Sequence, residues 1–371
     1  MTVIEGTAQR SAFIDLARCV EPADGTVGRL VERLGPIAVV DRIREGGTGL
    51  GHEEGLRARL ERADHVPADE QAARVGARII TRGESEWPSQ LDDLGAIAPY
   101  ALWAAGAANL RLLALRSIAV VGARACSAYG EEVARSWSAE LATHGWCVLS
   151  GGAYGIDAAA HRGALAVGAP TVCVLAGGVD VPYPRAHDAL IARIADEGLV
   201  VSETAPGEPV RRQRFLSRNR IIAAVTRATL VVEAAERSGT TATARSAQVM
   251  NRPVMAVPGP VTSPVSAGCH RMIGDGEAML VTSAADVVRS LDFGHHGFEV
   301  GAAPRVERER DRLGSRERQV LDAFPARGDI DPDDLRARAG LAGAQVWAAL
   351  GILESAGWVA SSAGQWRLVR R

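Results

Sequence analysis

The chain has 371 residues, enough for two or three domains, and contains no lysine, so its basic side chains other than histidine are all arginines. The formal net charge of −2 excludes a general electrostatic attraction to nucleic acid or to anionic membranes. Five widely spaced cysteines lack metal-ligand spacing, and we find neither a leader nor an apolar run of membrane-spanning length. We therefore expect a cytoplasmic protein without a membrane span or a metal, in which any site for a polyanion is local.

The N-terminal residues 1–75 show a mostly helical pattern, and we assign residues 1–80 to a helical domain. The turn Leu34-Gly35-Pro36 is compatible both with a hairpin that binds the DNA backbone and with a plain helical appendage. Spaced prolines and aromatic residues between Thr81 and Gly106 indicate an extended strap docked on the following domain.

A strand–helix–strand unit over residues 117–157 organises the rest of the chain. The apolar run Ile118–Val121 stops at Gly122-Ala123-Arg124, and after a helical pattern a second run, Trp146–Leu149, stops at Gly151-Gly152. Strands that end in glycine on either side of a helix are typical of a parallel sheet. Ligands of open α/β sheets bind at the carboxyl ends of strands, beside helix N-termini that favour anions. The arginine in the first turn makes that turn a candidate anion site.

Further apolar runs alternate with helical patterns through the middle of the chain. They cover residues 171–175, 199–202, 229–232, 254–257 and 278–281. This alternation predicts an α/β domain over residues 81–292, with a parallel sheet covered on both faces. No Gly-x-Gly-x-x-Gly follows the first strand, and a Walker motif is impossible without lysine, so no nucleotide cofactor is predicted.

The C-terminal part of the chain begins with a segment rich in glycine and then in charge, residues 293–312, which predicts a flexible linker. Three helical patterns and a hairpin predict a winged helix over residues 313–371. The helices are expected over residues 315–324, 331–339 and 343–355. The presumed recognition helix, Gly340–Leu353, has no charged residue, whereas a helix that reads a DNA groove normally carries arginine or polar groups. We therefore expect a protein-contact surface there, which argues against a transcription regulator.

The strongest local concentration of positive charge lies between Glu208 and Glu233, where the sequence has six arginines and no acidic residue. Arginine forks suit phosphate oxygens and stack on bases, and a solvated basic loop is the alternative. Phe215 within this run is either a stacking residue for a base or part of the core. The segment Ser238-Gly239-Thr240 opens a predicted helix and offers hydroxyl and N–H groups to a phosphate, although a plain helix cap has the same pattern.

Catalytic candidates are few. Asp157, His161 and Glu203 lie near predicted strand or helix ends. Asp157 and His161 are one helical turn apart and close enough to pair, but no nucleophile stands beside them. The sequence therefore predicts no catalytic residue.

Taken together, these segments resemble the DNA-processing protein A (DprA/Smf) family over roughly residues 87–288. The matching motifs are, in order, Val120–Arg124 with Tyr129-Gly130, Ser150–Asp157 with His161, Gly178 to Tyr183-Pro184, Ser202-Glu203, Arg218–Ala223, Glu233 with Ser238–Thr240, and Val257–Gly259. The resemblance implies an extended Rossmann-like sheet between the helical and winged-helix segments. It also implies a homodimer without an enzymatic role that binds and protects single-stranded DNA in natural transformation and recombination and helps load the RecA recombinase.

Carried over by position, the resemblance places DNA-binding residues in the glycine turns, the arginine run and the helix start that follows it. They are Arg124, Gly151, Gly152, Tyr154, Arg185, Arg212, Phe215, Arg218, Asn219, Arg220, Ser238, Gly239 and Thr240. Four of these arginines are expected to form one pocket that tracks phosphates: Arg124, Arg185, Arg218 and Arg220. The chain departs from the family at Tyr154, where lysine is common, and at Leu216, where proline is usual.

An enzyme is the alternative function. Rossmann-like nucleotide phosphoribohydrolases resemble the chain at the Gly239-Thr240 turn, but they use Pro-Gly-Gly-x-Gly-Thr followed by a glutamate. Here the lead-in is Glu236-Arg237-Ser238, and Thr243 stands in the place of the glutamate. The missing carboxylate argues against hydrolysis.

Overall fold

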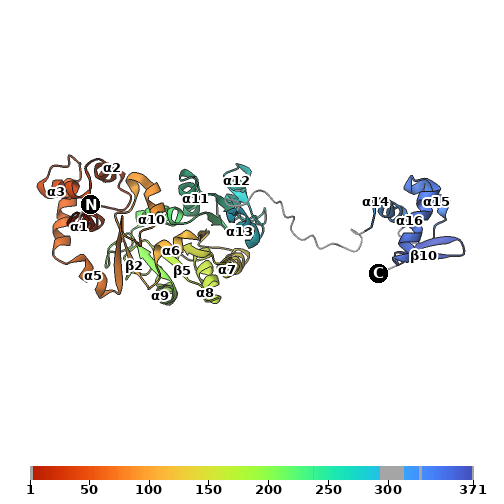
Figure 1. Ribbon diagram of the computed structural model, residues 1–371, viewed down its shortest axis with the longest axis horizontal. Helices are drawn as coiled ribbons and strands as arrows, with labels where there is room; N and C mark the ends of the chain where they lie inside the picture. The colour runs from red at the N-terminus through yellow and green to blue at the C-terminus, as the bar shows by residue number, and fades with distance from the viewer. Residues whose placement is uncertain (1–2, 237, 293–312, 326–327, 370–371) are drawn as a thin grey trace. The chain divides into compact units, whose positions relative to one another are not determined.

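The computed structural model of the protein describes residues 3–236, 238–292, 313–325 and 328–369. The chain divides into two compact units, Met1–His296 and Gly297–Arg371 (Figure 1). The N-terminal helices therefore belong to the same unit as the sheet. The linker that the sequence predicts over residues 293–312 lies outside the described residues.

Helices form the N-terminal part of the first unit, as the pattern over residues 1–75 predicts. They are α1 (Val3–Cys19), α2 (Gly25–Leu34), α3 (Pro36–Glu45), α4 (Glu53–Asp64) and α5 (Ala68–Arg74). Asp24 begins α2, because its carboxylate accepts the backbone N–H groups of Thr26 and Val27. Apolar side chains from α1, α3 and α4 meet in a common core. The most buried of them include Leu16, Ile43, Leu56 and Leu60.

A nine-stranded sheet forms the centre of the described part of this unit. Its strands are β1 (Ala77–Thr81), β2 (Ala101–Ala105), β3 (Ser117–Val121), β4 (Cys147–Ser150), β5 (Thr171–Leu175), β6 (Leu199–Ser202), β7 (Thr229–Val231), β8 (Val254–Ala256) and β9 (Met279–Leu280). Their order across the sheet is β1-β2-β6-β5-β4-β3-β7-β8-β9. The strands from β6 to β9 run parallel, and β2 and β1 add an antiparallel edge. The expected α/β class with an extended Rossmann-like sheet is confirmed.

Helices cover both faces of the sheet (Figure 1). They are α6 (Leu110–Leu115), α7 (Ala128–Thr143), α8 (Ile156–Ala166), α9 (Asp188–Glu197), α10 (Arg212–Val225), α11 (Gly239–Val249), α12 (Ala267–Gly274) and α13 (Ala284–Asp292), with short 3-10 helices η1 (Ser89–Ile97) and η2 (Arg185–His187). On one face, Ile221 of α10 packs in a core with Leu149 and Val231. On the other, Leu141 of α7 packs with Val148. Because helices lie on both sides, β3 and β5 are buried along their whole length, which explains their continuous apolar sequences.

The segment between Thr81 and Gly106 differs from the expected strap. Its end forms β2, which pairs antiparallel with β6, and the residues up to Thr81 form β1. Trp103 of β2 is fully buried. Two strands of five residues, separated by prolines and by η1, give too little alternation to be recognised in the sequence. The sheet therefore extends two strands beyond the prediction.

The strand order creates a switch point between β3 and β7. From β3 the chain adds β4, β5 and β6 on one side, and it then returns to add β7, β8 and β9 on the other. At such a point the connections leave neighbouring strands in opposite directions, so a crevice forms at the carboxyl ends of the two strands. The turn Gly122-Ala123-Arg124 follows β3, and Glu233 follows β7. The fold thus brings the candidate anion turn to the position where open α/β sheets bind ligands.

The second unit contains the three helices and the hairpin that the sequence predicts. They are α14 (Ser315–Ala323), α15 (Pro332–Ala339) and α16 (Gly343–Ser355), followed by β10 (Val359–Ser362) and β11 (Gln365–Leu368). Asp331 caps α15 at its start, and Gly340 ends it in a left-handed conformation. Among the helices described in either unit, none combines the length and the apolarity needed to cross a bilayer.

Candidate nucleic-acid interface

A cavity of about 370 Å³ lies at the switch point, within the size range of small-ligand sites. Its walls come from the turn after β3, the start of α8, one side of α10 and the start of α11. The lining side chains include Arg124, Asp157, Phe215, Leu216, Arg218, Asn219, Ile222, Ser238, Thr240, Thr243 and Val265, with the backbone of Gly122 and Gly239. The cavity therefore collects residues from three separate sequence motifs.

The turn after β3 is held against the loop that begins α8. The backbone N–H of Ile156 donates to the carbonyl oxygen of Ala123 at 3.3 Å. Gly155 has a φ of 73°, and a Cβ at this position would collide with the carbonyl oxygens of Ala123 and Arg124. This close backbone approach fixes the turn, while the Arg124 side chain remains exposed beside the cavity.

Arg124, Phe215 and Tyr183 form a continuous array at the cavity, which we call the arginine–aromatic array. The guanidinium carbon of Arg124 lies 4.9 Å from the centre of the Phe215 ring. The Phe215 and Tyr183 rings meet edge to face, with centres 5.5 Å apart. Tyr183 is 47% exposed. The array therefore offers a cation for a phosphate and an open aromatic surface for a base.

Among the helices that begin at this edge of the sheet, α7, α8 and α11 begin beside the cavity, and carboxylates occupy the N-termini of two of them. At α7, buried Glu233 accepts the backbone N–H of Ser127 at 2.9 Å. At α8, Asp157 in the first turn accepts N–H groups of the preceding loop. At α11, the first turn has no acidic residue and the Ser238 side chain makes no capping bond. The positive end of α11 is therefore open to an external anion.

The start of α11 also carries an unsatisfied hydroxyl. The Ser238 side-chain oxygen is buried and has no hydrogen-bond partner among the described residues. Asn219 of α10 holds the start of α11 in position, because Asn219 Nδ2 donates to the carbonyl oxygen of Gly239 at 3.3 Å. A phosphate oxygen at this place would satisfy both the hydroxyl and free backbone N–H groups.

Arg218 lines the cavity, but its guanidinium donates hydrogen bonds to buried carbonyl oxygens of the protein. Its Nη1 donates to the carbonyl oxygens of Gly151, at 2.7 Å, and of Val174, and the residue is 6% exposed. Burial lowers the pKa of the guanidinium, and nearby Asp157 counteracts part of that effect. A Cβ on Gly151 would collide with the Arg218 guanidinium, so a larger residue there would displace the arginine from its present position. Arg218 therefore holds the turn after β4 in place.

Arg220 does not line the cavity. Its Nη2 donates to Glu203 Oε1 at 2.7 Å, and both residues are buried. Burial raises the pKa of Glu203, and the charge of Arg220 opposes that shift. The structure thus does not bring Arg220 together with Arg124, in contrast to the single pocket that the sequence suggests. Arg220 lies on the side of α10 that faces Glu203, at the end of β6. A run of arginines in a sequence does not show which side of a helix each one will occupy.

The other predicted residues lie around the cavity without lining it. Gly152 accepts a hydrogen bond from His187 Nδ1 through its carbonyl oxygen, at 2.9 Å. Tyr154 is exposed and packs against the same histidine, with ring centres 4.9 Å apart. Arg185 and Arg212 are exposed at the starts of η2 and α10. They belong to the surface that surrounds the cavity.

The catalytic candidates have separate partners. Asp157 Oδ2 accepts backbone N–H groups, whereas His161 Nδ1 lies 2.8 Å from the Thr171 hydroxyl oxygen. That hydroxyl donates to Val148, so His161 Nδ1 carries the proton and donates to Thr171. Burial lowers the pKa of His161 to about 3, so the ring is neutral at neutral pH. Asp157 and His161 do not form the pair that their spacing allows.

Comparison with known proteins agrees with this geometry. The family model described as DNA recombination-mediator protein A matches residues 78–292. The DNA processing protein DprA of Mycobacterium tuberculosis is 45% identical over 382 residues, which cover 99% of this chain and 96% of that protein. The chain belongs to the DNA recombination-mediator protein A family. This membership confirms the DprA/Smf resemblance that the sequence motifs carry.

Solved structures of the DprA family support the assignment. DNA processing protein A from Streptococcus pneumoniae has a TM-score of 0.64 and 30% identity, and the match covers 79% of this chain and 99% of that one. The protein from Helicobacter pylori has a TM-score of 0.53 and 25% identity, with 59% of this chain and 97% of that chain covered. The Helicobacter pylori structure concerns the single-stranded DNA binding mode of that protein.

Some residues at the cavity cannot be identified from the sequence. The sequence shows Tyr183 only as part of a motif, because its contact with Phe215 joins a loop to helix α10, which follows later in the chain. Val265 also lines the cavity, although nothing in the sequence distinguishes it from a core residue. Knowledge of the strand order would have identified the cavity, since the loops that line it surround the switch point.

Proposed function

We propose that this protein binds single-stranded DNA at the cavity between β3 and β7. The arginine–aromatic array carries this proposal, because a stacked guanidinium beside an exposed ring suits one phosphate and one base of an unpaired strand. The open N-terminus of α11 and the free Ser238 hydroxyl supply a second phosphate position. The Helicobacter pylori relative, which binds single-stranded DNA, supports the same ligand class.

The geometry favours an unpaired strand over a duplex. A base stacked on Tyr183 or Phe215 has to leave its own stack, which is costly in duplex DNA and cheap in a single strand. The net charge of −2 also gives no general electrostatic attraction to the dense charge of a duplex. We expect a fluorescent dT20 strand to bind at least tenfold more tightly than a duplex of the same length in an anisotropy titration. Equal or tighter binding of the duplex would contradict the proposal.

A nucleotide-processing enzyme is the alternative, and the cavity gives it little support. Asp157 is the carboxylate among the described lining residues, and backbone N–H groups and the Arg218 charge hold it. Thr243 is buried at the position where phosphoribohydrolases carry a glutamate. No side chain in the described lining therefore stands ready as a general base, and we propose a binding role without catalysis.

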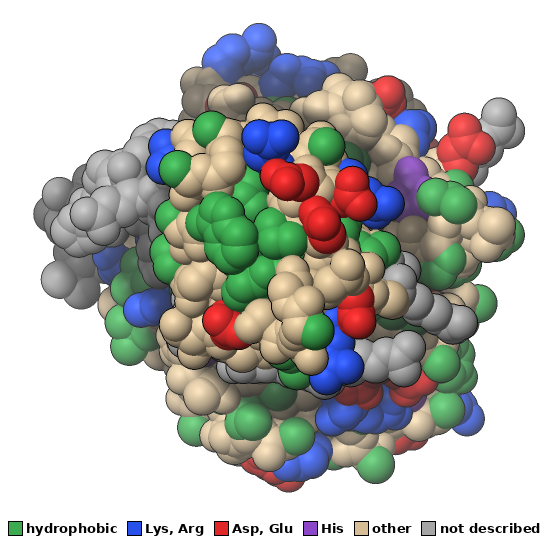
Figure 2. All heavy atoms as spheres, turned by 90° about the vertical axis from the view of Figure 1, so that its right-hand side faces the viewer, with side chains coloured by type: hydrophobic (Ala, Val, Ile, Leu, Met, Phe, Trp, Pro, Cys, Tyr) green, Lys and Arg blue, Asp and Glu red, His purple; other side chains and the backbone are tan. Residues whose placement is uncertain are grey.

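The C-terminal unit is proposed to contact protein and not the DNA strand. Figure 2 shows hydrophobic side chains gathered in a patch with several acidic side chains beside it. The exposed large apolar residues of this unit include Trp347 and Ile352 of α16, and Trp347 packs edge to face on Trp366 of the hairpin. An apolar patch of this kind suits contact with another protein better than contact with phosphates.

Deletion of residues 305–371 should therefore leave the affinity for dT20 within a few-fold of that of the full chain. The cavity and the arginine–aromatic array lie entirely in the other unit, Met1–His296. Anisotropy titration of the truncated and full chains at the same salt concentration checks this expectation. A loss of 100-fold, about 2.7 kcal/mol, would show that the C-terminal unit binds the strand.

We further propose that the protein forms a homodimer through the free edge of its sheet. Within the described residues, strand β9 ends the sheet and pairs with β8 alone, and its side chains Met279 and Leu280 are 52% and 49% exposed. An apolar strand edge is a template for pairing with a second copy. Replacing both residues with arginine should change the sedimenting mass from two chains to one chain of 39.0 kDa. An unchanged mass would place the dimer contact elsewhere.

The biological setting follows from family membership. The family acts in DNA processing and recombination, and we propose that this chain protects incoming single strands in the cytoplasm and helps load the RecA recombinase during natural transformation. The expected result is faster assembly of RecA on a strand bound by this protein than on a strand covered by an unrelated single-strand binder. RecA assembly that this protein slows or leaves unchanged would limit its role to protection.

A further inference from the structure

The exposed side of α10 leads away from the cavity towards the N-terminal helices. Phe215 and Asn219 are four residues apart and therefore lie on one side of the helix, and Arg211 is the residue that immediately precedes the helix. Asn219 and Phe215 line the cavity, and Arg211 stands at the N-terminal end of the helix. At 1.5 Å per residue, the row spans about 12 Å. A strand that leaves the cavity along this row reaches Arg211.

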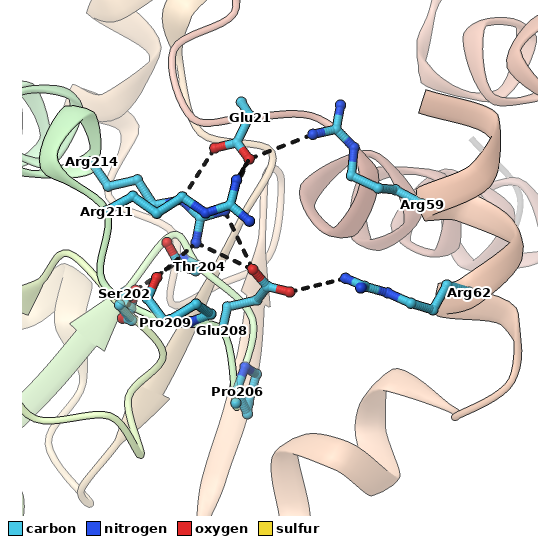
Figure 3. Close-up of polar contacts among 12 residues, drawn as sticks. Glu21, Arg59, Arg62, Ser202, Thr204, Pro206, Glu208, Pro209, Arg211 and Arg214 are labelled. Atoms are coloured by element: carbon cyan, nitrogen blue, oxygen red, sulfur yellow. Dashed lines mark hydrogen bonds and ion pairs between the residues drawn. The ribbon is translucent and has the colours of Figure 1, made fainter. Parts of the chain in front are cut away.

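At Arg211 the row meets an arginine cluster built by two parts of the chain (Figure 3). Glu21, which follows α1, accepts from Arg211 Nη1 at 3.0 Å, and its Oε1 also accepts from Arg59 of α4 at 3.5 Å. Glu208 accepts from Arg62 of α4 at 3.1 Å. We call these residues, together with Arg214, the α4–α10 cluster. It joins the N-terminal helices to the helix that lines the cavity.

The α4–α10 cluster carries excess positive charge. Its four arginines, at positions 59, 62, 211 and 214, face two carboxylates, Glu21 and Glu208, so the local sum is +2. Arg214 has a side chain that is only 7% exposed, and it bonds both carboxylates, which holds the cluster together. The two carboxylates therefore cannot neutralise the three outer guanidiniums.

The outer arginines are free to accept a further anion. The side chains of Arg59, Arg62 and Arg211 are 33%, 73% and 49% exposed. Ion pairs that are open to solvent are weak, and each guanidinium has five N–H donors. The buried Arg59 Nε also has no hydrogen-bond partner among the described residues. A phosphate can therefore join the cluster without breaking a strong interaction.

We propose that Arg59, Arg62 and Arg211 bind the phosphates of the DNA strand where it leaves the cavity. The N-terminal helices then form part of the DNA path instead of a passive appendage. This inference rests on the proposed single-strand binding at the cavity. Arg59 and Arg62 are three residues apart on α4, so their guanidiniums point from the same side of the helix towards consecutive phosphates.

The test compares oligonucleotide lengths. The double variant R59A/R62A should bind dT20 roughly tenfold more weakly, about threefold per exposed contact, and its log–log salt slope should fall by about 1.4, or 0.7 for each contact. Binding to the shortest dT strand that still occupies the cavity should be unchanged, because that strand does not reach α4. The control R57A/R135A removes the same number of exposed arginines, from positions outside the cluster.

The outcomes separate this inference from the proposed function. A length-dependent loss in R59A/R62A but not in the control supports the path, as does recovery of the salt slope in R59K/R62K, since lysine still meets phosphate as a point charge. An unchanged dT20 affinity, or an equal loss at every length, overturns it and leaves the cluster as a contact between helices. Failure of the unmodified chain to bind any oligonucleotide would instead reject the cavity as the site.

Discussion

Replacing Arg124 with alanine should weaken the binding of single-stranded DNA by about 10- to 150-fold. The guanidinium stands exposed beside the cavity and is stacked on Phe215, so the variant loses a charged hydrogen bond to phosphate, worth roughly 1.5–3 kcal/mol. A phosphate contact depends on salt and hardly on base sequence. The loss should therefore be equal for dT20 and for a mixed sequence, and the salt slope should fall by about 0.7.

Arg135 provides the matched control for Arg124. It is also an exposed arginine of the same unit, but it lies on α7 and pairs with Glu132 of its own helix. The variant R135A should bind DNA like the unmodified chain. Similar losses in R124A and R135A would mean that net charge, and not a specific site, determines the affinity.

Replacing Arg220 with alanine should destabilise the fold by about 3–5 kcal/mol, because it leaves the carboxylate of Glu203 buried without its partner. The midpoint of urea unfolding should fall accordingly. Since Arg220 does not line the cavity, the folded fraction of R220A should keep most of its affinity for dT20. A normal unfolding midpoint combined with weak DNA binding would return Arg220 to the phosphate-binding residues.

A second variant separates the buried charge from the lost side chain. In R220M/E203Q neither position carries a charge, and replacing a buried ion pair with uncharged groups of similar size is often nearly neutral for stability. The double variant should therefore be more stable than R220A, although it lacks the same arginine. If it unfolds as early as R220A, the pairing of Arg220 with Glu203 does not explain the effect.

The sequence was sufficient for most of the elements, with β1 and β2 as exceptions, but it did not show in which direction the arginine side chains point. Glycine turns after β3 and β4, the parallel strands and the helices of the C-terminal unit follow from patterns within a few residues. Residues 212–220 form the first part of α10, Arg211 immediately precedes it, and that helix passes from solvent into the core. Arg218 and Arg220 therefore turn to buried carbonyl and carboxylate oxygens, while Arg211 remains outside. A linear pattern of charge cannot distinguish these directions.

Contacts between segments that are distant in the chain could also not be predicted from the sequence. The strand order that opens the cavity depends on which strand β7 joins, and no local pattern encodes that choice. The α4–α10 cluster pairs Glu21 with Arg214, 193 residues later in the chain. Both features arise from packing between elements, and both bear directly on the proposed DNA path.

Photochemical cross-linking tests the location of the DNA site most directly. A dT20 strand that carries 5-iododeoxyuridine should cross-link, on irradiation, to aromatic residues that stack on its bases, and mass spectrometry then identifies the peptide. We predict cross-links at Tyr183 or Phe215, which are lost in R124A at a DNA concentration that saturates only the unmodified chain. Cross-links confined to Trp347 or other residues of the C-terminal unit would contradict it.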